Sequence, residues 1–160
     1  MRTGPLLSMI LLSGLALANA AVPGDEPVEF SLLRLNGEPL ALSELRGQWV
    51  ILNYWATWCG PCRKEIPELS ELHDQRRDIT VLGLAYEEAT VEELTVFLDE
   101  FEATYPILLV DVYKPPEPFG APRVLPTTII LDPNGVVVKN YAGPVTKTLL
   151  QEFIDNFSEP

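Results

Sequence analysis

The chain contains little cysteine, histidine or methionine. Of its 160 residues only Cys59 and Cys62 are cysteines, His73 is the one histidine, and Met1 and Met9 are the two methionines. Soft metal ions prefer thiolate, thioether and imidazole ligands. A soft metal ion would therefore have to be held almost entirely by the two cysteines, which are the main chemistry-bearing group of the chain.

Positive charge is also scarce. The chain has 11 Lys and Arg against 23 Asp and Glu, a formal net charge of −12 at pH 7, and loss of Arg2 with the first 20 residues would make it −13. Such an acidic protein repels phosphate backbones, so nucleic acid is excluded as a partner. The charge favours a client protein with a basic surface, unless it serves solubility alone.

Long apolar runs are absent except at the amino terminus. There a single positive residue precedes an apolar run over residues 6–17, which ends in an A-x-A motif at 18–20. The run is shorter than the roughly 20 residues of a membrane-spanning helix and fits a cleaved secretory signal peptide. We expect a signal peptide over 1–20, one domain over 21–160 and a periplasmic or otherwise exported protein, with an uncleaved membrane anchor as the alternative.

Hydrophobic periodicity predicts strands that alternate with helices. The expected elements are a hairpin over 30–42 turning at Asn36-Gly37, a strand over 49–55, a helix from Gly60 to about Arg76, a strand over 79–86, a helix opened by a capping box at 90–93, a strand over 107–110, a hairpin over 127–141 and a helix over about 149–157. The proline-dense segment before residue 127 should hold at most one helical turn. This order predicts an α/β fold, a mixed sheet with helices on both faces.

The cysteine pair follows a predicted buried strand and opens a predicted helix. This is the carboxyl end of a strand, where α/β folds place their sites. The helix amino terminus supplies partial positive charge and free N–H groups, so the pKa of Cys59 should fall below its ordinary value of about 8.5. We expect the Cys59 sulfur to point to solvent as the attacking thiolate, with Cys62 one turn further in as the resolving cysteine.

These features predict thiol–disulfide exchange without a further cofactor or metal. Cys59 would attack a client disulfide, and Cys62 would then attack the Cys59 sulfur and release the reduced client. The same residues in reverse would make an oxidase or isomerase. A carrier holding copper(I) on both thiolates is another interpretation. A structural staple is the last, although closing so short a loop adds only about 2 kcal/mol.

Residues around the pair are candidates for supporting roles. Pro61 suits the first helical turn, and Gly60 allows close approach of a client chain. Trp58 either belongs to the core or shapes the client surface. Glu65 lies one turn after Cys62; facing the pair it would be partly buried, with a raised pKa, and could shuttle a proton, whereas facing solvent it would be an ordinary helical glutamate. Pro126 opens a strand, and the local composition alone favours a plain turn with a trans bond before this proline.

The motifs WCGPC, after a buried strand, and LPTT, before an Asp-Pro-Asn-Gly turn, resemble those of the thioredoxin superfamily. More narrowly, LALSELRGQWVILNYWATWCGPCRKEIPEL, YPILLVD and LPTTIILDPNG are similar to the exported ResA/TlpA-type thiol-disulfide oxidoreductases. The resemblance covers residues 29–157. It implies a thioredoxin-like fold with an amino-terminal hairpin and a central α-β insertion over about 90–110.

The resemblance also implies a site and a function. Pro126 would be cis and opposite Cys59, the backbone beside Leu125 would pair with the client chain, and Glu65 would act as the acid near the cysteines. The protein would be a monomer that reduces client proteins with electrons from a membrane donor, in cytochrome c maturation or in assembly of an oxidase copper site. One departure leaves the client open: relatives have a helix before the cis-proline, where this chain has four prolines, at 115, 116, 118 and 122.

Overall fold

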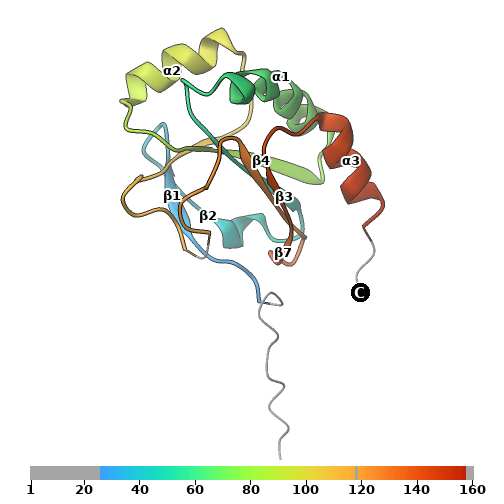
Figure 1. Cartoon of the computed structure of the whole chain (residues 1–160). Coiled ribbons are helices and arrows are strands. Elements are labelled where there is room, and N and C mark those ends of the chain that lie inside the picture. Colours follow the sequence, from blue (N-terminus) through green and yellow to red (C-terminus); the bar gives the residue numbers. More distant parts are fainter. Residues whose placement is uncertain (1–25, 118, 158–160) are drawn as a thin grey trace, which may run out of the picture.

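A computed structural model describes residues 26–117 and 119–157 of the chain (Figure 1). The predicted signal peptide, residues 1–20, lies outside the described residues. Within them, no helix combines the length and the apolar character needed to cross a membrane.

The predicted strands and helices are all present, with small differences at their ends. The strands are β1 (Ser31–Arg34), β2 (Pro39–Ala41), β3 (Trp49–Trp55), β4 (Ile79–Ala85), β5 (Ile107–Leu109), β6 (Thr127–Leu131) and β7 (Val137–Ala142). The helices are α1 (Gly60–Gln75), α2 (Val91–Glu100) and α3 (Lys147–Asp155), and a 3₁₀ helix that the sequence did not indicate, η1 (Leu42–Leu45), follows the first hairpin. The capping box of α2 is confirmed, since Thr90 Oγ1 accepts from the N–H of Glu93 and Glu93 accepts from that of Thr90.

Strand β3 is the strand on which the site is built. The strands form one sheet in the order β2-β1-β5-β4-β3-β6-β7. β3 pairs in parallel with β4, from Trp49 opposite Ile79 to Trp55 opposite Ala85, and antiparallel with β6. Every residue of β3 after Trp49 is buried, which confirms the predicted strand with both faces covered.

The amino-terminal hairpin extends this sheet past the insertion. β1 pairs antiparallel with β2 and, on its other side, antiparallel with β5, the strand that follows α2. The turn at Asn36-Gly37 is as predicted, and Gly37 has a φ of +82°, which glycine adopts without strain. The hairpin and β5, the strand of the insertion, are thus neighbours in one sheet.

All three α-helices cover the same face of the sheet, so the prediction of helices on both faces is wrong (Figure 1). One core joins α1, α2 and α3 to that face and includes Ile66, Leu69, Leu94, Leu98, Leu150, Ile154, Ile51, Trp55 and Val81. The opposite face is covered by the amino-terminal segment and η1, in a core that includes Val28, Leu40, Leu42, Val50, Leu52, Tyr54, Leu84 and Ile129.

The proline-dense connection between β5 and β6 explains why no α-helix covers the opposite face. Its described residues form turns and bends, with one helical turn in which the N–H groups of Phe119 and Gly120 both donate to the carbonyl of Pro116. Proline has no N–H donor and disfavours a longer helix. Phe119 packs instead edge-to-face on Phe30, with ring centroids 5.9 Å apart, over the second core.

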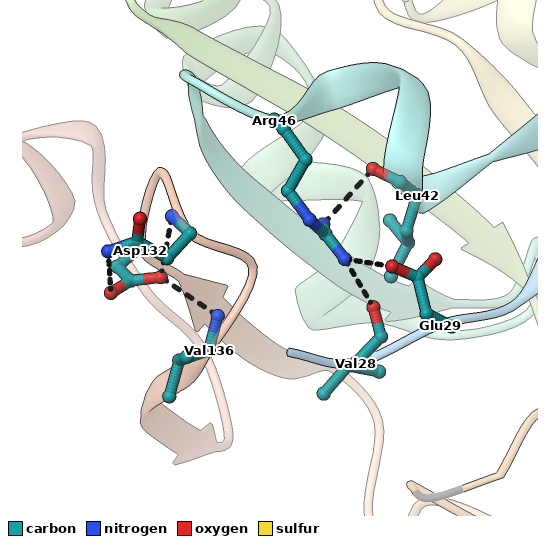
Figure 2. A network of polar contacts seen from close by, with 7 residues as sticks. Val28, Glu29, Leu42, Arg46, Asp132 and Val136 are labelled. Carbon is teal, nitrogen blue, oxygen red and sulfur yellow. Dashed lines mark hydrogen bonds and ion pairs between the residues drawn. The ribbon is translucent and has the colours of Figure 1, made fainter. Parts of the chain in front are cut away.

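Arg46, directly after η1, connects three segments on this side of the sheet (Figure 2). Its guanidinium donates to the carbonyl oxygens of Leu42 (3.2 Å) and Val28 (3.0 Å) and forms an ion pair with Glu29. The N–H of Val28 donates in turn to the carbonyl of Gly135 (2.8 Å), in the turn between β6 and β7. The amino-terminal segment is therefore fixed to both η1 and the last hairpin.

The turn between β6 and β7 requires glycine for two reasons. Asp132 closes the turn, because its Oδ1 accepts from the N–H groups of Asn134 (3.0 Å) and Val136 (2.8 Å) (Figure 2). Gly135 has a φ of +85°. A Cβ at this position would lie 2.2 Å from Nη1 of Arg46, so that guanidinium would have to leave its partners.

We predict that Gly135→Ala destabilises the protein more than Gly37→Ala does. Both substitutions place a side chain at a positive φ, which costs about 1–2 kcal/mol. Only Gly135→Ala also displaces Arg46, since a Cβ at Gly37 meets nothing within 4 Å. Chemical denaturation should show an additional loss of about 1 kcal/mol for Gly135→Ala, and equal losses would contradict the role given to Arg46.

Candidate functional site

Cys59 and Cys62 form a disulfide where β3 passes into α1. The S–S distance is 2.09 Å and the two Cα atoms are 5.3 Å apart. Cys59 is the N-cap of α1, and its Sγ accepts from the N–H of Cys62 at 3.3 Å. Gly60 and Pro61 are the first two helical residues, both exposed. The predicted arrangement of an N-cap cysteine and a second cysteine one turn in is confirmed.

The cysteines are more buried than the sequence suggests. Cys59 is 5% exposed and Cys62 is 1% exposed, so in the disulfide form the first sulfur does not project into solvent. The reason is packing, because both cysteines belong to the core under α1, and Leu125 lies against that core. Cys59 is still the more accessible of the two. Trp58, in contrast, is 67% exposed and belongs to the surface.

A clamp of two charged residues holds the loop before Cys59. The carboxylate of Glu87, after β4, accepts from the N–H (2.6 Å) and the hydroxyl (2.9 Å) of Thr57. Arg63 Nε donates to the carbonyl of Thr57 at 2.7 Å, and the guanidinium lies over the rings of Phe97 and Phe101 at 5.6 and 6.0 Å. Thr57 is thus held by the segment after β4 and by Arg63 of α1, which in turn packs on Phe97 of α2.

A cis-proline directly precedes β6, the strand that pairs antiparallel with β3. The Leu125-Pro126 bond is cis, as the resemblance implied and against the trans turn that the composition favoured. β6 starts at Thr127, which pairs with Tyr54, so the buried Pro126 lies beside the end of β3. Leu125 and Trp58 line a shallow pocket of about 300 Å³, together with Tyr86, Pro122, Arg123 and Val124. The proposed client-binding residues Trp58 and Leu125 therefore share one surface.

Glu65 faces the protein interior. It is 3% exposed, and its Oε1 accepts from the N–H of Val145 in a short hydrogen bond. Its Oε2 accepts from the side-chain amide of Asn53 (3.2 Å), which also donates to Thr128 Oγ1 (3.0 Å). The carboxylate is therefore held between α1, β3, β6 and the segment before α3.

Burial raises the pKa of Glu65 to about 7. The charge of Glu68 acts in the same direction, while the hydrogen bonds from Val145 and Asn53 lower the pKa and only partly offset the burial. Of the two interpretations open from the sequence, the buried carboxyl with a raised pKa is the one observed. A carboxyl with this pKa, one helical turn from Cys62, can exchange a proton near neutral pH.

His73 is far from the cysteines. It lies in the last turn of α1, about 20 Å along the helix from Cys59, where its Nδ1 accepts from the N–H of Val81. Burial lowers its pKa. Within residues 26–117 and 119–157, no three His, Cys, Asp or Glu side chains form a cluster that could hold a metal ion.

The hydrogen bonds that join Thr57 to Glu87 and Arg63 could not be predicted from a sequence motif. Arg63 and Glu87 are 24 positions apart and belong to different elements, and neither forms a motif with the cysteines. The one local signal is the position of Glu87 just after a buried strand that runs parallel to β3. Strand ends at the same edge of a sheet bring their following residues together.

Comparison with known proteins agrees with this geometry. The profile of the AhpC/TSA family matches residues 23–140. Thiol-disulfide oxidoreductase ResA of Halalkalibacterium halodurans is 35% identical over 134 residues, which cover 82% of this chain and 75% of the relative. Thioredoxin-like protein YneN of Bacillus subtilis is 33% identical over 135 residues, covering 82% and 78%. The crystal structure of a DsbF homologue from Corynebacterium diphtheriae has a TM-score of 0.70 at 29% identity, covering 82% of this chain and 86% of that one.

We predict that Glu65 makes the folded protein less stable as the pH rises. Its pKa is about 4.5 in a solvated chain and about 7 in the folded protein, so folding favours the protonated form. The stability that protonation provides is complete below about pH 4.5 and is lost as the pH rises through about 7, a change on the order of 3 kcal/mol. Denaturant unfolding across this range should show the fall in the native chain and a flatter profile in Glu65→Gln, and parallel profiles would contradict the burial argument.

Proposed function

Because the chain belongs to the AhpC/TSA family of thioredoxin-like proteins, we propose that it is an exported oxidoreductase that reduces disulfides in client proteins. The observation that carries the proposal is the Cys59–Cys62 disulfide at the start of α1. A thiolate at Cys59 would receive partial positive charge and the Cys62 N–H from the helix terminus. Cys59 is the nucleophile of the proposal, and Cys62 is the resolving cysteine.

The reaction proceeds in two exchanges. The Cys59 thiolate attacks one sulfur of the client disulfide, an S–S bond forms between the two proteins, and the other client sulfur leaves as a thiolate. The Cys62 thiol then passes its proton to the Glu65 carboxylate, and its sulfur attacks the Cys59 sulfur. The bond between Cys59 and the client breaks, the second client sulfur leaves with the electron pair, and the Cys59–Cys62 disulfide is formed.

The client is expected on the surface that Trp58 and Leu125 share. Trp58 offers a large exposed apolar side chain beside Cys59, and Gly60 and Pro61 leave the first turn of α1 unobstructed. A Cβ at Gly60 would meet nothing within 4 Å, so the space there is open to an approaching chain. Leu125 precedes the cis-proline, where an extended client segment could pair with the backbone. These positions support the assignment of Trp58, Gly60, Pro61, Leu125 and Pro126 to client binding.

The charges around the pair favour reduction of clients over oxidation. Strong thiol oxidants owe their high potential to a stabilised reduced form. In this protein Glu65 lies one turn from Cys62, and Glu87 binds the loop just before Cys59. Negative charge near a thiolate destabilises it and opposes the helix terminus. The disulfide is then the preferred form, and the dithiol is a good electron donor.

The cellular role is a further part of the proposal. Export is supported by the apolar amino terminus, and a dithiol in an oxidising compartment needs electrons, for which we propose a membrane donor. We propose a role in cytochrome c maturation, with assembly of an oxidase copper site as the alternative, because these are the roles that the resemblance of the sequence motifs to the exported ResA/TlpA-type oxidoreductases implies. The proline-dense connection lines the pocket next to Trp58 and would therefore form part of the client surface.

The function is tested by trapping a client on Cys59. Reduced Cys62→Ser should accumulate a mixed disulfide with an oxidised client such as insulin, because the resolving sulfur is missing. Cys59→Ser is the matched control and should accumulate far less, since its remaining sulfur is the less exposed one. Intact mass of the non-reduced products measures both. Equal trapping, or none by Cys62→Ser, would contradict the assigned roles.

The direction of electron flow is tested by the reduction potential of the pair. We expect a value near the roughly −270 mV of thioredoxin, measured by equilibration with dithiothreitol and glutathione buffers. Glu87→Gln removes one of the negative charges and should make the potential less negative by roughly 30 mV, a tenfold change in the equilibrium. A native value near about −120 mV would identify an oxidase instead.

A further inference from the structure

Arg63 is a charged residue of α1 to which the proposed reaction assigns no role. It directly follows Cys62 and is exposed, yet both its side chain and its backbone bind the loop that leads to Cys59. Its Nε donates to the carbonyl of Thr57 at 2.7 Å, and its backbone N–H donates to the carbonyl of Cys59 at 3.2 Å. The side chain therefore reaches from the first turn of α1 back to the residue two positions before the nucleophile.

A stack of three aromatic rings supports the guanidinium. Trp55, the last residue of β3, stacks on Phe97 of α2, with ring centroids 5.5 Å apart and an angle of 17° between the planes. Phe97 stacks in turn on Phe101, with centroids 4.6 Å apart. The guanidinium carbon of Arg63 lies 5.6 Å from the Phe97 centroid and 6.0 Å from the Phe101 centroid, which is the range of a cation–π interaction. The position of the cation is thus set by α2 as well as by α1.

The charge of Arg63 is not cancelled by an ion pair. Within the described ranges 26–117 and 119–157, no carboxylate lies at ion-pair distance from its guanidinium. Glu87 binds the same residue, Thr57, through the N–H and the hydroxyl rather than through the carbonyl. A positive charge near a thiolate stabilises it, and a negative charge destabilises it. Arg63 and Glu87 should therefore act on the Cys59 thiolate with opposite signs.

We propose that Arg63 is a positioning residue through which α2 favours the reduced form of the Cys59–Cys62 pair. The proposal rests on the proposed function, in which Cys59 reacts as a thiolate. The aromatic rings hold the guanidinium at the Thr57 carbonyl, where its positive charge lies beside the loop that leads to Cys59. Arg63 exchanges no proton or electron with the cysteines. Its charge opposes that of Glu87, so the disulfide remains reducible by an electron donor.

Lys64 provides a matched control for the charge of Arg63. It is the next residue of α1, is also exposed, and forms no ion pair in the part of the chain that the structure describes. A solvated ammonium on a flexible stem is strongly hydrated and screened by salt. Removing the charge of Lys64 therefore changes the net charge of the helix by the same amount as removing that of Arg63, without removing a cation that is bound at the loop.

The test is the reduction potential of the cysteine pair in variants of these two residues. Arg63→Gln should make the potential more negative by roughly 20 mV, a fivefold change in the equilibrium, because the reduced form loses a stabilising charge. Lys64→Gln should shift the potential by less than half as much. Arg63→Lys keeps the charge, so its potential should lie between those of the native protein and Arg63→Gln. A shift in Arg63→Gln no larger than that in Lys64→Gln, or no recovery in Arg63→Lys, would overturn the proposal.

The sign of the shift separates an electrostatic role from a merely structural one. Glu87→Gln should make the potential less negative, opposite to Arg63→Gln. Loosening of the loop at Thr57 would instead move the potential in the same direction in both variants, since each substitution removes a hydrogen bond to that residue. Shifts of the same sign would therefore refute the role given to Arg63.

The contribution of α2 is tested by removing a ring from the stack. Phe97→Leu should shift the potential in the same direction as Arg63→Gln, and should add nothing when Arg63→Gln is already present. Phe101→Leu leaves the Trp55–Phe97 stack in place and should behave in the same way, so it serves if Phe97→Leu does not fold. Shifts that add to that of Arg63→Gln would contradict the coupling through Arg63. Because the potential is measured in dithiothreitol and glutathione buffers without a client, these results stand even if client reduction fails.

Discussion

The direct passage from β3 into α1 is the constraint on which the rest of the structure depends. β3 is paired on both sides and buried on both faces, so its end has a fixed position in the sheet. Only four residues separate the end of β3 from the start of α1. The first helical turn is therefore placed at the sheet edge by a strand that is paired on both sides. The backbone N–H of Cys62, in that turn, donates to the Cys59 sulfur.

The periodicity of α1 places buried and exposed functional side chains on different sides of the helix. Cys62 and Glu65 lie three residues apart and are both buried in the folded protein, and burial raises the pKa of Glu65. Arg63, one position after Cys62, points to the other side and holds the loop at Thr57. One helical turn thus contains the Cys62 sulfur, the buried Glu65 carboxyl and the Arg63 guanidinium, which holds the loop before Cys59. The periodicity of one helix thus gives three neighbouring side chains different surroundings.

Local sequence patterns predicted the helices and strands of this fold. They did not predict the features that depend on packing between residues far apart in the chain. The apolar run of β3, the Asn36-Gly37 turn and the capping box at Thr90 are signals within a few residues of chain, and each is confirmed. The absence of an α-helix from the opposite face depends on the connection between β5 and β6, whose prolines disfavour a helix there. The burial of Glu65 depends on Val145, 80 positions away, and the position of Thr57 depends on Glu87, 30 positions away. Such pairings leave no periodic trace in the sequence.

The two outer strands of the sheet also limit how this protein can associate with other chains. β2 has three residues and begins with a proline, which has no N–H to donate outward. β7 carries the exposed Lys139 and pairs with β6 through an irregular register. Short, charged or bulged borders are poor templates for strand addition and for amyloid-like growth. Binding of an extended polypeptide by strand addition at either border of the sheet is therefore disfavoured.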